Sequence, residues 1–296
     1  MTIECDYMKK APEVIVVLGP TASGKSDFAV DLSLQMGGEV ISADSRQIYK
    51  GLDIGTGKIK KEEMKGVKHY MLDVIDPNEE FSVAKYKKLA TPILKDILSR
   101  NKAAIICGGT GQYIDALIFD NKVPAVPPNK ALRNSLEEKS AEELYNELLK
   151  KDKRRALEID RHNKVRLIRA LEIIEVLGKV PRLTKLKLKY NTKIYLLSPS
   201  RELLRERITK RLEERLKIGM IEEVENLMRD RKNSHDKKKF GLEYVSIAKF
   251  LEKKISEDDM KQEIITKSMQ YAKRQETWNK KYLRDFKDIA EIIEVK

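Results

Sequence analysis

The sequence predicts an α/β fold, in which a parallel β-sheet core carries a mostly α-helical insertion and a helical C-terminal region. The first observation is a short β-branched run, residues 14–18 (VIVVL), followed at once by a glycine-rich turn (GPTASGKS) and a segment with helical spacing. The second is that apolar runs alternate with helical segments up to residue 120, as in parallel sheets with right-handed crossovers. The third is a change to helical periodicity beyond residue 120. A strand, a glycine-rich loop and a helix in this order predict a P-loop NTPase-like core.

The first strand and the first helix have clear local signals. Residues 14–18 lack polar alternation, which is typical of a parallel strand that is covered on both faces. Helical spacing over residues 26–36 ends at Gly37-Gly38, because glycine lets the chain leave a helix. Residues 39–43 (EVISA) are then expected to form the second strand.

A second helix and a third strand complete the first part of the sheet. Ser82 has the position of a helix N-cap, and the helix is expected to run to about Ser99. Pro92 inside this helix predicts a kink, because proline removes one backbone donor. Residues 103–107 (AAIIC) form the third predicted strand, which ends at Gly108-Gly109.

The pattern changes after Asp120. Residues 123–129 (VPAVPPN) are typical of a linker, and residues 130–177 have helical periodicity with a capping-box pattern at Ser140–Glu143. Gly178 is the predicted stop, and the stretch 179–193 carries six Lys or Arg residues and no acid. We therefore expect a helical insertion over residues 121–190.

The chain is expected to return to the sheet after this insertion. Residues 193–197 (KIYLL) read as a strand, and the rest is mainly helical to about Phe286. The segment 229–239 is basic and of low complexity, which predicts an exposed loop. The catalytic core is therefore expected to comprise residues 1–120 and 191–296.

The charge of the chain is concentrated in its second part. Residues 1–120 hold 16 Lys and Arg against 17 Asp and Glu, whereas residues 121–296 hold 44 against 30. The net charge of +13 thus belongs to the second part, which favours a polyanionic partner or a well-solvated helical surface.

The composition also argues against a membrane protein, a secreted protein with disulfides and a zinc protein. No run approaches the length of a membrane span, and the N-terminal residues lack the apolar segment of a secretory signal. Two cysteines, Cys5 and Cys107, cannot build a disulfide framework and fit a reducing compartment, so a cytoplasmic protein is expected. The three histidines and the lack of a CxxC pattern argue against a zinc site. We also expect a monomer.

The segment 19–26 matches the pattern GxxxxGK[ST] in the strand–helix context that this motif requires. Glycines let backbone N–H groups curl around an anion, and the N-terminus of the helix adds partial positive charge. Lys25 supplies a mobile positive charge, and the hydroxyl of Ser26 is a candidate ligand of Mg²⁺. The predicted phosphate-binding residues are Gly19, Pro20, Thr21, Ala22, Ser23, Gly24, Lys25 and Ser26.

Asp44 follows the second predicted strand, at the sheet edge where the phosphate loop lies. Its carboxylate is a candidate magnesium ligand or general base, and a turn aspartate is the alternative. Arg46 and Gln47 are candidates for reading a base. Thr110 is expected on the same edge, as a donor to a phosphate oxygen or as a turn residue. No acid follows the strand 103–107, which argues against a motor ATPase.

Taken together, these segments resemble the tRNA dimethylallyltransferase family, also called tRNA isopentenyltransferases. The resemblance covers nearly the whole chain, and its specificity comes from the order and spacing of seven blocks. These blocks are GPTASGKS (19–26), ISADSRQIYKGLDIGTGK (41–58), HYMLDVIDPNEEFSVAKY (69–86), GGTGQYIDAL (108–117), NKVRLIRALEI (163–173), LSPSRELLRERITKRLEERLKIGMIEEV (197–224) and YAKRQETW (271–278).

The resemblance implies transfer of a dimethylallyl group from dimethylallyl diphosphate to N6 of the adenine on the 3′ side of the anticodon. It implies that Asp44 is the general base, and that Lys25, Ser26 with Mg²⁺, Thr110 and Arg211 surround the diphosphate. Adenine N6 is a poor nucleophile, so removal of its proton and stabilisation of the departing diphosphate both matter.

The resemblance also implies contacts with the anticodon stem-loop, where the target base must leave its stack. The predicted tRNA-binding residues are Asp44, Ser45, Arg46, Gln47, Arg133, Val165, Arg166, Leu167, Ile168, Arg169, Lys273 and Arg274. Tyr271 and Trp278 are candidates for stacking on a base, with core packing as the alternative.

Some residues depart from the family pattern. Bacterial members often have FxxIGY where this chain has FGLEY (240–244), which puts one RNA contact in doubt. The absence of a zinc-finger extension implies the bacterial type.

Three alternatives remain at this level: a P-loop kinase of a small metabolite, a prenyltransferase acting on free adenine nucleotides, and a nucleotide-gated RNA-binding module. The kinase alternative leaves the basic second part without a role.

Overall fold

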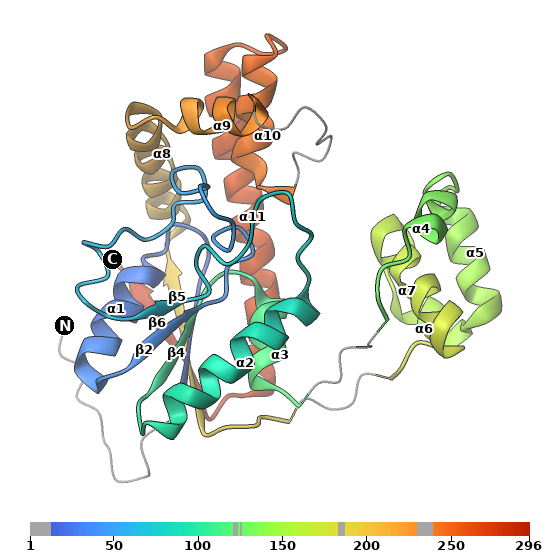
Figure 1. Cartoon of the computed structure of the whole chain (residues 1–296), viewed down its shortest axis with the longest axis horizontal. Coiled ribbons are helices and arrows are strands. Elements are labelled where there is room, and N and C mark those ends of the chain that lie inside the picture. Colours follow the sequence, from blue (N-terminus) through green and yellow to red (C-terminus); the bar gives the residue numbers. More distant parts are fainter. Residues whose placement is uncertain (1–12, 121–123, 125, 183–186, 230–238) are drawn as a thin grey trace. The chain divides into compact units, whose positions relative to one another are not determined.

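The computed structural model describes residues 13–120, 124, 126–182, 187–229 and 239–296. The chain divides into two compact units, which are described separately (Figure 1). One unit, the core, is built from the residues up to Phe119 and from Leu188 onward, and the other, the insertion, is Asp120–Lys187.

The core contains one parallel sheet, which in the described residues has six strands in the order β3-β2-β4-β1-β5-β6. The strands are β1 (Val14–Leu18), β2 (Glu39–Ser42), β3 (His69–Tyr70), β4 (Ala104–Cys107), β5 (Thr192–Pro199) and β6 (Ala290–Val295). The four strands that we predicted are confirmed within two residues at each end. The strands β3 and β6 were not predicted, because β3 has two residues and β6 lies beyond the last helix at the edge of the sheet.

The register of β1 brings functional segments together. Val17 pairs with Cys107 of β4 and with Tyr195 of β5, and Ser42 of β2 also pairs with Cys107. All these strands are parallel, so their carboxyl ends meet at one edge of the sheet. The segments that follow β1, β2 and β4 are the glycine-rich loop, the Asp44 turn and Gly108-Gly109, and all three therefore lie at that edge.

The core helices follow the predicted order with two differences. The helix α1 (Lys25–Met36) begins one residue earlier than expected, and α3 (Gly111–Ile118) was not predicted. In α2 (Val83–Ser99), Ser82 accepts a hydrogen bond from the N–H of Lys85, as expected of an N-cap, and the helix continues past Pro92. The remaining helices are α8 (Arg201–Lys217), α9 (Met220–Arg229), α10 (Leu242–Leu251) and α11 (Glu257–Asp285).

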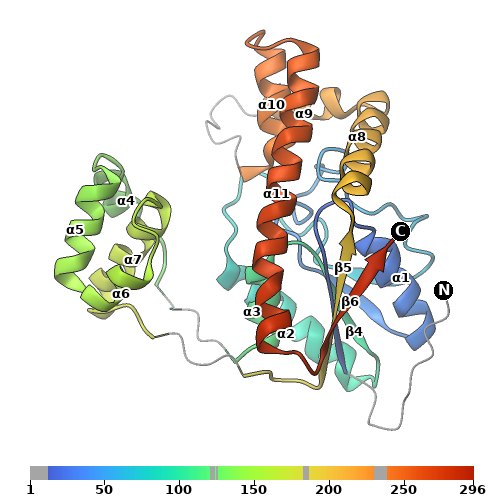
Figure 2. The same cartoon turned by 180° about the vertical axis from the view of Figure 1, so that it is seen from behind.

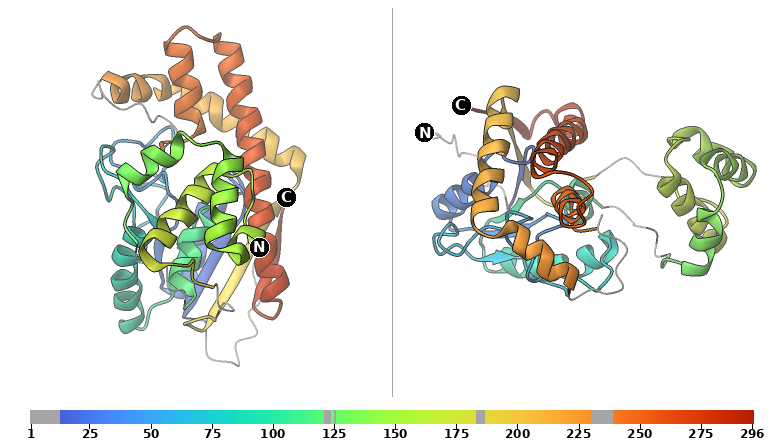
Figure 3. Two further views of the ribbon diagram at one scale, coloured as in Figure 1. Left: turned by 90° about the vertical axis from the view of Figure 1, so that its right-hand side faces the viewer. Right: turned by 90° about the horizontal axis from the view of Figure 1, so that it is seen from above.

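The long helix α11 connects distant parts of the core. It packs against α8 and α10 at one end and against α3 and β6 toward the other (Figures 2 and 3). It ends at Asp285, as predicted, with Phe286 as its C-cap. Its packing brings residues from the end of the sequence to the glycine-rich loop near the beginning.

A buried acid stabilises the sheet at the opposite, amino-terminal edge. Glu39 begins β2, and its carboxylate accepts hydrogen bonds from both terminal nitrogens of Arg100 at 2.6 and 2.7 Å, from Lys102 at 2.8 Å and from the Tyr70 hydroxyl at 2.8 Å. The Arg100 contact, with those of Lys102 and Tyr70, holds the pKa of Glu39 well below its usual range despite burial. This network ties β2 to β3 and to the end of α2.

The insertion has a core of its own. Its described part contains the helices α4 (Lys130–Glu137), α5 (Ala141–Lys151), α6 (Lys153–Glu158) and α7 (Lys164–Leu177). The predicted capping box at Ser140 and Glu143 is confirmed, as is the end of α7 at Gly178. Leu144, Leu148 and Leu167 are fully buried in its centre, and burial of such a side chain contributes about 1.5–3 kcal/mol.

Three predicted loop segments lie partly outside the described residues. These are the linker 123–129, of which 123 and 125 are not described, the basic stretch 179–193, of which 183–186 are not described, and the loop 229–239, of which 230–238 are not described. No helix in the part of the chain that the structure describes is long and apolar enough to cross a membrane.

Candidate functional site

A cavity of about 870 Å³ opens at the carboxyl edge of the sheet. The glycine-rich loop and the start of α1 form one wall, from Thr21 to Phe28. Other walls come from Asp44 and Gln47 after β2, from Gly108 and Gly109 after β4, and from α8 and α11. The cavity therefore lies entirely within the core, at the place where the sequence predicted a phosphate site.

The loop has the backbone conformation that the motif predicts. Ala22 and Gly24 have positive φ angles of 60° and 86°, and Gly24 is the N-cap of α1. A side chain at Gly19 would meet the hydroxyl of Ser23 at 2.7 Å and the carbonyl of Leu197 at 3.0 Å, so only glycine fits there. The buried Ser23 hydroxyl has no hydrogen-bond partner within the described residues, which leaves it available to a ligand.

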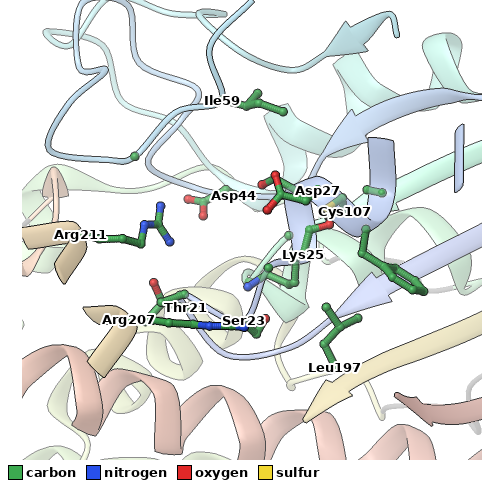
Figure 4. A pocket seen from close by; sticks show the side chains of 18 of the residues that line it. Thr21, Ser23, Lys25, Asp27, Asp44, Ile59, Cys107, Leu197, Arg207 and Arg211 are labelled. Atoms are coloured by element: carbon green, nitrogen blue, oxygen red, sulfur yellow. Dashed lines mark hydrogen bonds between the residues drawn. The ribbon is translucent and has the colours of Figure 1, made fainter. Parts of the chain in front are cut away.

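Lys25 extends its amine back along the loop and donates a hydrogen bond to the carbonyl of Pro20 at 2.6 Å. Burial of this amine lowers its pKa from 10.5 to about 8. The nearby Asp44 carboxylate opposes this shift, whereas the Arg211 guanidinium adds to it. Figure 4 shows Lys25, Asp44 and Arg211 around one space, with Arg211 reaching in from a different element than Lys25.

The helix α8 supplies most of the positive charge. Arg207, Lys210, Arg211 and Arg215 all line the cavity. Burial lowers the pKa of Arg211, and burial together with the charge of Arg211 lowers the pKa of Arg215 to about 10. We predicted Arg211 alone, although the spacing of the four residues by three and four positions places them on one helix face and was a usable signal.

Asp44 lies just after β2 and faces the cavity, as expected. Its Oδ1 atom accepts a hydrogen bond from the N–H of Arg46 at 2.8 Å, so it also shapes its own turn. Thr110 holds the same turn, because its hydroxyl accepts from the N–H of Ser45 at 3.0 Å and contacts the Ser45 hydroxyl at 3.2 Å. Thr110 is not among the residues that line the cavity. Its described contacts position the Asp44 turn.

Gln275 of α11 fixes the glycine-rich loop against the end of β4. Its Oε1 atom accepts from the N–H of Thr21 at 2.8 Å, and its Nε2 atom donates to the carbonyl of Gly109 at 3.2 Å. We did not predict this residue, because nothing local distinguishes a buried glutamine on a charged helix. Only the packing of α11 over the loop reveals its role.

The other predicted residues on α11 lie at the cavity, on the surface or against a neighbouring helix. Tyr271 lines the cavity, and burial raises the pKa of its hydroxyl to about 12. Arg274 lies over the Tyr271 ring at 5.7 Å, and the side chains of Lys273 and Arg274 are exposed. Trp278 packs on Gly111, where any side chain would meet the indole nitrogen at 1.9 Å. Trp278 therefore packs against the start of α3 in this structure.

Residues after Asp44 are divided between the cavity and its surroundings. Gln47 lines the cavity, and its Nε2 atom donates to the carbonyl of Gly57 at 3.2 Å. Ser45 and Arg46 are half-buried beside the cavity rather than on its lining.

In the insertion, two predicted RNA contacts bind a buried carboxylate. Glu172 is 1% exposed and accepts from Arg133 at 2.7 and 2.9 Å, from Arg169 at 3.1 Å and from the N–H of Asn129 at 2.9 Å. Burial alone would raise the pKa of Glu172, but these hydrogen bonds outweigh burial and lower it. Arg133 and Arg169 remain about one-third exposed, so their outer edges face solvent.

The side chains of the segment 165–169 lie partly on the surface and partly inside the insertion. Val165 is 78% exposed and Arg166 is exposed, whereas Leu167 and Ile168 are buried among the apolar residues of the insertion. Helical periodicity explains this, because four consecutive residues cannot all lie on one face. Leu167 and Ile168 therefore pack in the centre of the insertion, and contact of the segment 165–169 with RNA stays a prediction.

Oxygen donors suited to Mg²⁺ lie at the mouth of the loop. The exposed Ser26 and Asp27 line the cavity, as does Asp44. Mg²⁺ is commonly held by one or two such groups together with substrate phosphates and water. No cluster of three or more His, Cys, Asp or Glu residues forms a complete protein cage within the described ranges.

Comparison with known proteins gives consistent matches. A family model described as IPP transferase matches residues 47–282. A tRNA dimethylallyltransferase of Caldanaerobacter subterraneus is 40% identical over 284 residues, which covers 92% of this chain and 90% of that protein. The crystal structure of a tRNA isopentenylpyrophosphate transferase from Bacillus halodurans is similar with a TM-score of 0.70 and 32% identity, covering 96% of this chain and 90% of that one. A eukaryotic dimethylallyltransferase acting on tRNA is similar with a TM-score of 0.84 and 27% identity, covering 96% and 74%.

Proposed function

This chain belongs to the IPP transferase family, and from that premise we propose that it transfers a dimethylallyl group from dimethylallyl diphosphate to N6 of the adenine 3′ to the anticodon in tRNA. The observation that carries the proposal is a cavity in which the carboxylate of Asp44 lies near the half-buried cations Lys25 and Arg211. Such a cavity suits a reaction that releases diphosphate and removes a proton.

The diphosphate is held by the glycine-rich loop. Backbone N–H groups of residues 24–26, the Ser23 hydroxyl and the N-terminus of α1 all suit an anion. Arg207, Arg211 and Lys25 then stabilise the negative charge that grows on the leaving group. Since these groups are fixed before the substrate arrives, they need little reorganisation during the reaction.

The transfer step uses Asp44 as general base. The lone pair of N6 forms a bond to C1 of the dimethylallyl group, while the C1–O bond breaks and its electrons remain on the diphosphate. The N6 proton passes to the Asp44 carboxylate and from there to solvent. Thr110 and Ser45 hold the turn that carries this carboxylate.

Magnesium is part of the proposal. The Ser26 hydroxyl, with Asp27 beside it, would hold Mg²⁺ together with diphosphate oxygens. When bound, Mg²⁺ would offset the charge of the diphosphate and so make it a better leaving group.

The tRNA is bound by positive charge and by stacking. The basic second part of the chain suits the phosphate backbone of an anticodon stem-loop, and the exposed Lys273, Arg274 and Arg166 are candidates for such contacts. Tyr271 offers a ring beside Asp44 on which a flipped adenine would stack. We propose that the enzyme acts in the cytoplasm as a monomer.

A test compares acceptors directly. The purified protein is incubated with labelled dimethylallyl diphosphate and, in parallel, with unmodified tRNA, AMP or ATP. Label in tRNA alone agrees with the proposal, and label in free nucleotides would indicate a nucleotide prenyltransferase. ATP turnover with a metabolite and without any prenyl transfer would indicate a kinase.

A further inference from the structure

A loop opposite the phosphate-binding segment closes part of the cavity. This is the 52–59 loop, which contributes Thr56, Gly57 and Ile59 to the cavity wall. It lies between β2 and β3 in the chain and has no regular secondary structure of its own. Its position must therefore be fixed by other elements.

The carboxylate of Glu223 on α9 binds three consecutive backbone N–H groups of this loop. It accepts from Asp53 and Ile54 at 2.8 Å each and from Gly55 at 2.9 Å. Consecutive N–H groups that converge in this way form an anion-binding nest. Here the anion is supplied by the protein itself, from a position 170 residues away in the sequence.

A second element completes this contact. The Tyr244 hydroxyl on α10 donates to the Glu223 carboxylate at 2.6 Å, and the Tyr244 ring packs so closely on Gly55 that any side chain there would meet it at 2.6 Å. Burial, followed by the charge of Glu223, raises the pKa of Tyr244 well above its usual value, so the hydroxyl stays a donor. The loop is thus held by α9 and α10 together.

The position of the loop determines that of two cavity arginines. A side chain added at Gly57 would lie 1.8 Å from the guanidinium of Arg215 and 2.9 Å from that of Arg211, so both groups rest against the loop backbone. The carbonyl of Gly57 also accepts the hydrogen bond from Gln47. A shift of the loop would therefore move groups on the cavity side.

From these contacts we infer that Glu223 is a positioning residue, which holds the 52–59 loop as a wall of the diphosphate cavity and thereby fixes Arg211 and Arg215. The inference rests on the proposed function for the identity of the ligand. A displacement of about 1 Å in groups that orient a substrate can reduce the rate by about a hundredfold. Glu223 touches neither ligand nor reacting atoms in this arrangement.

The test uses the full-length protein and two readouts. Affinity for inorganic diphosphate is measured by calorimetry, and kcat and KM are measured with dimethylallyl diphosphate and tRNA. The variants are Glu223→Ala, Glu223→Gln and Tyr244→Phe. Glu222→Gln is the matched control, because Glu222 is the exposed neighbour on the same helix. Formate is added to each variant as a small replacement anion for the nest.

We expect Glu223→Ala to lower kcat/KM by about a hundredfold and to weaken diphosphate binding, with Glu223→Gln intermediate and Glu222→Gln unchanged. Formate should restore part of both losses in Glu223→Ala only. Unchanged values in Glu223→Ala would overturn the inference. A loss that formate does not restore, accompanied by a lower melting temperature, would also overturn it and indicate a general folding role.

Failure of the proposed function would give a different result. If the wild-type protein binds diphosphate but prenylates no tRNA, the function is wrong, and the affinity series still decides the role of Glu223.

Discussion

Raising the pH from about 7 to about 9 should weaken binding of dimethylallyl diphosphate, because Lys25 loses its proton in this interval. The amine of Lys25 is buried in the glycine-rich loop, and its pKa is about 8 rather than 10.5. A bound diphosphate favours the charged amine. Affinity is therefore full below the pKa of the free enzyme and falls as the pH rises through it.

The magnitude follows from this pKa. About nine-tenths of the amine is charged one pH unit below its pKa and about one-tenth one unit above it, so the affinity should fall about tenfold. The neighbouring Cys107 and Tyr271 do not titrate in this range, since burial raises the pKa of both to about 12. The ligand is also constant, because the last ionisation of a phosphate ester lies near pH 6.

Calorimetric titration of the protein with dimethylallyl diphosphate measures this change. Lys25→Arg is the control, because arginine stays charged throughout the range and its affinity should not vary with pH. A wild-type affinity that is constant between these pH values would refute the reasoning. It would mean that the amine is charged at both values or does not contact the ligand.

Three further predictions concern single carboxylates. Asp44→Asn should lower the single-turnover rate by a factor on the order of 10² while leaving tRNA affinity nearly unchanged, and an unaltered rate in rapid-quench experiments would remove its role as base. Glu39→Gln should lower the free energy of unfolding at neutral pH by about 3 kcal/mol in urea titrations, because it removes the buried carboxylate that binds Arg100 and Lys102. The pKa of Glu39 is lowered by folding, so the wild type should lose this advantage as the pH falls below about 4, and an equal stability difference at low pH would contradict the assignment. Glu172→Ala should unfold the insertion, seen as faster hydrogen exchange in α4 and α7 with the core unaffected, and unchanged exchange would show that Glu172 is dispensable.

Much of the fold could be predicted because its signals are local. The strand over 14–18 and the glycine-rich turn after it are encoded within about a dozen residues, and the helix caps at Ser82 and Ser140 each depend on four. The strand β3 could not be predicted from its own residues, since His69 and Tyr70 form a strand only by pairing with β2. Residues 290–295 (AEIIEV) carry only a weak strand signal for β6, because the adjacent Ile292 and Ile293 break the alternation of apolar and polar residues.

Some residues of the candidate site could be predicted from the sequence, and others could not. The loop residues and Asp44 were predictable, because their positions follow from the order of strands in a parallel sheet. Gln275 and Glu223 were not, because each contacts backbone atoms more than 160 residues away. The burial of Leu167 beside the exposed Val165 follows from helical periodicity, because only some positions of a helix face outward.

Mass spectrometry of the nucleosides in tRNA tests the central claim most directly. Unmodified tRNA is incubated with the wild-type protein and dimethylallyl diphosphate, digested, and compared with the same tRNA treated with Asp44→Asn. We predict an adenosine that carries one dimethylallyl group on N6, located immediately 3′ of the anticodon and formed much faster by the wild type. If the protein binds diphosphate but the digested tRNA contains no prenylated nucleoside, this account of the cavity is contradicted.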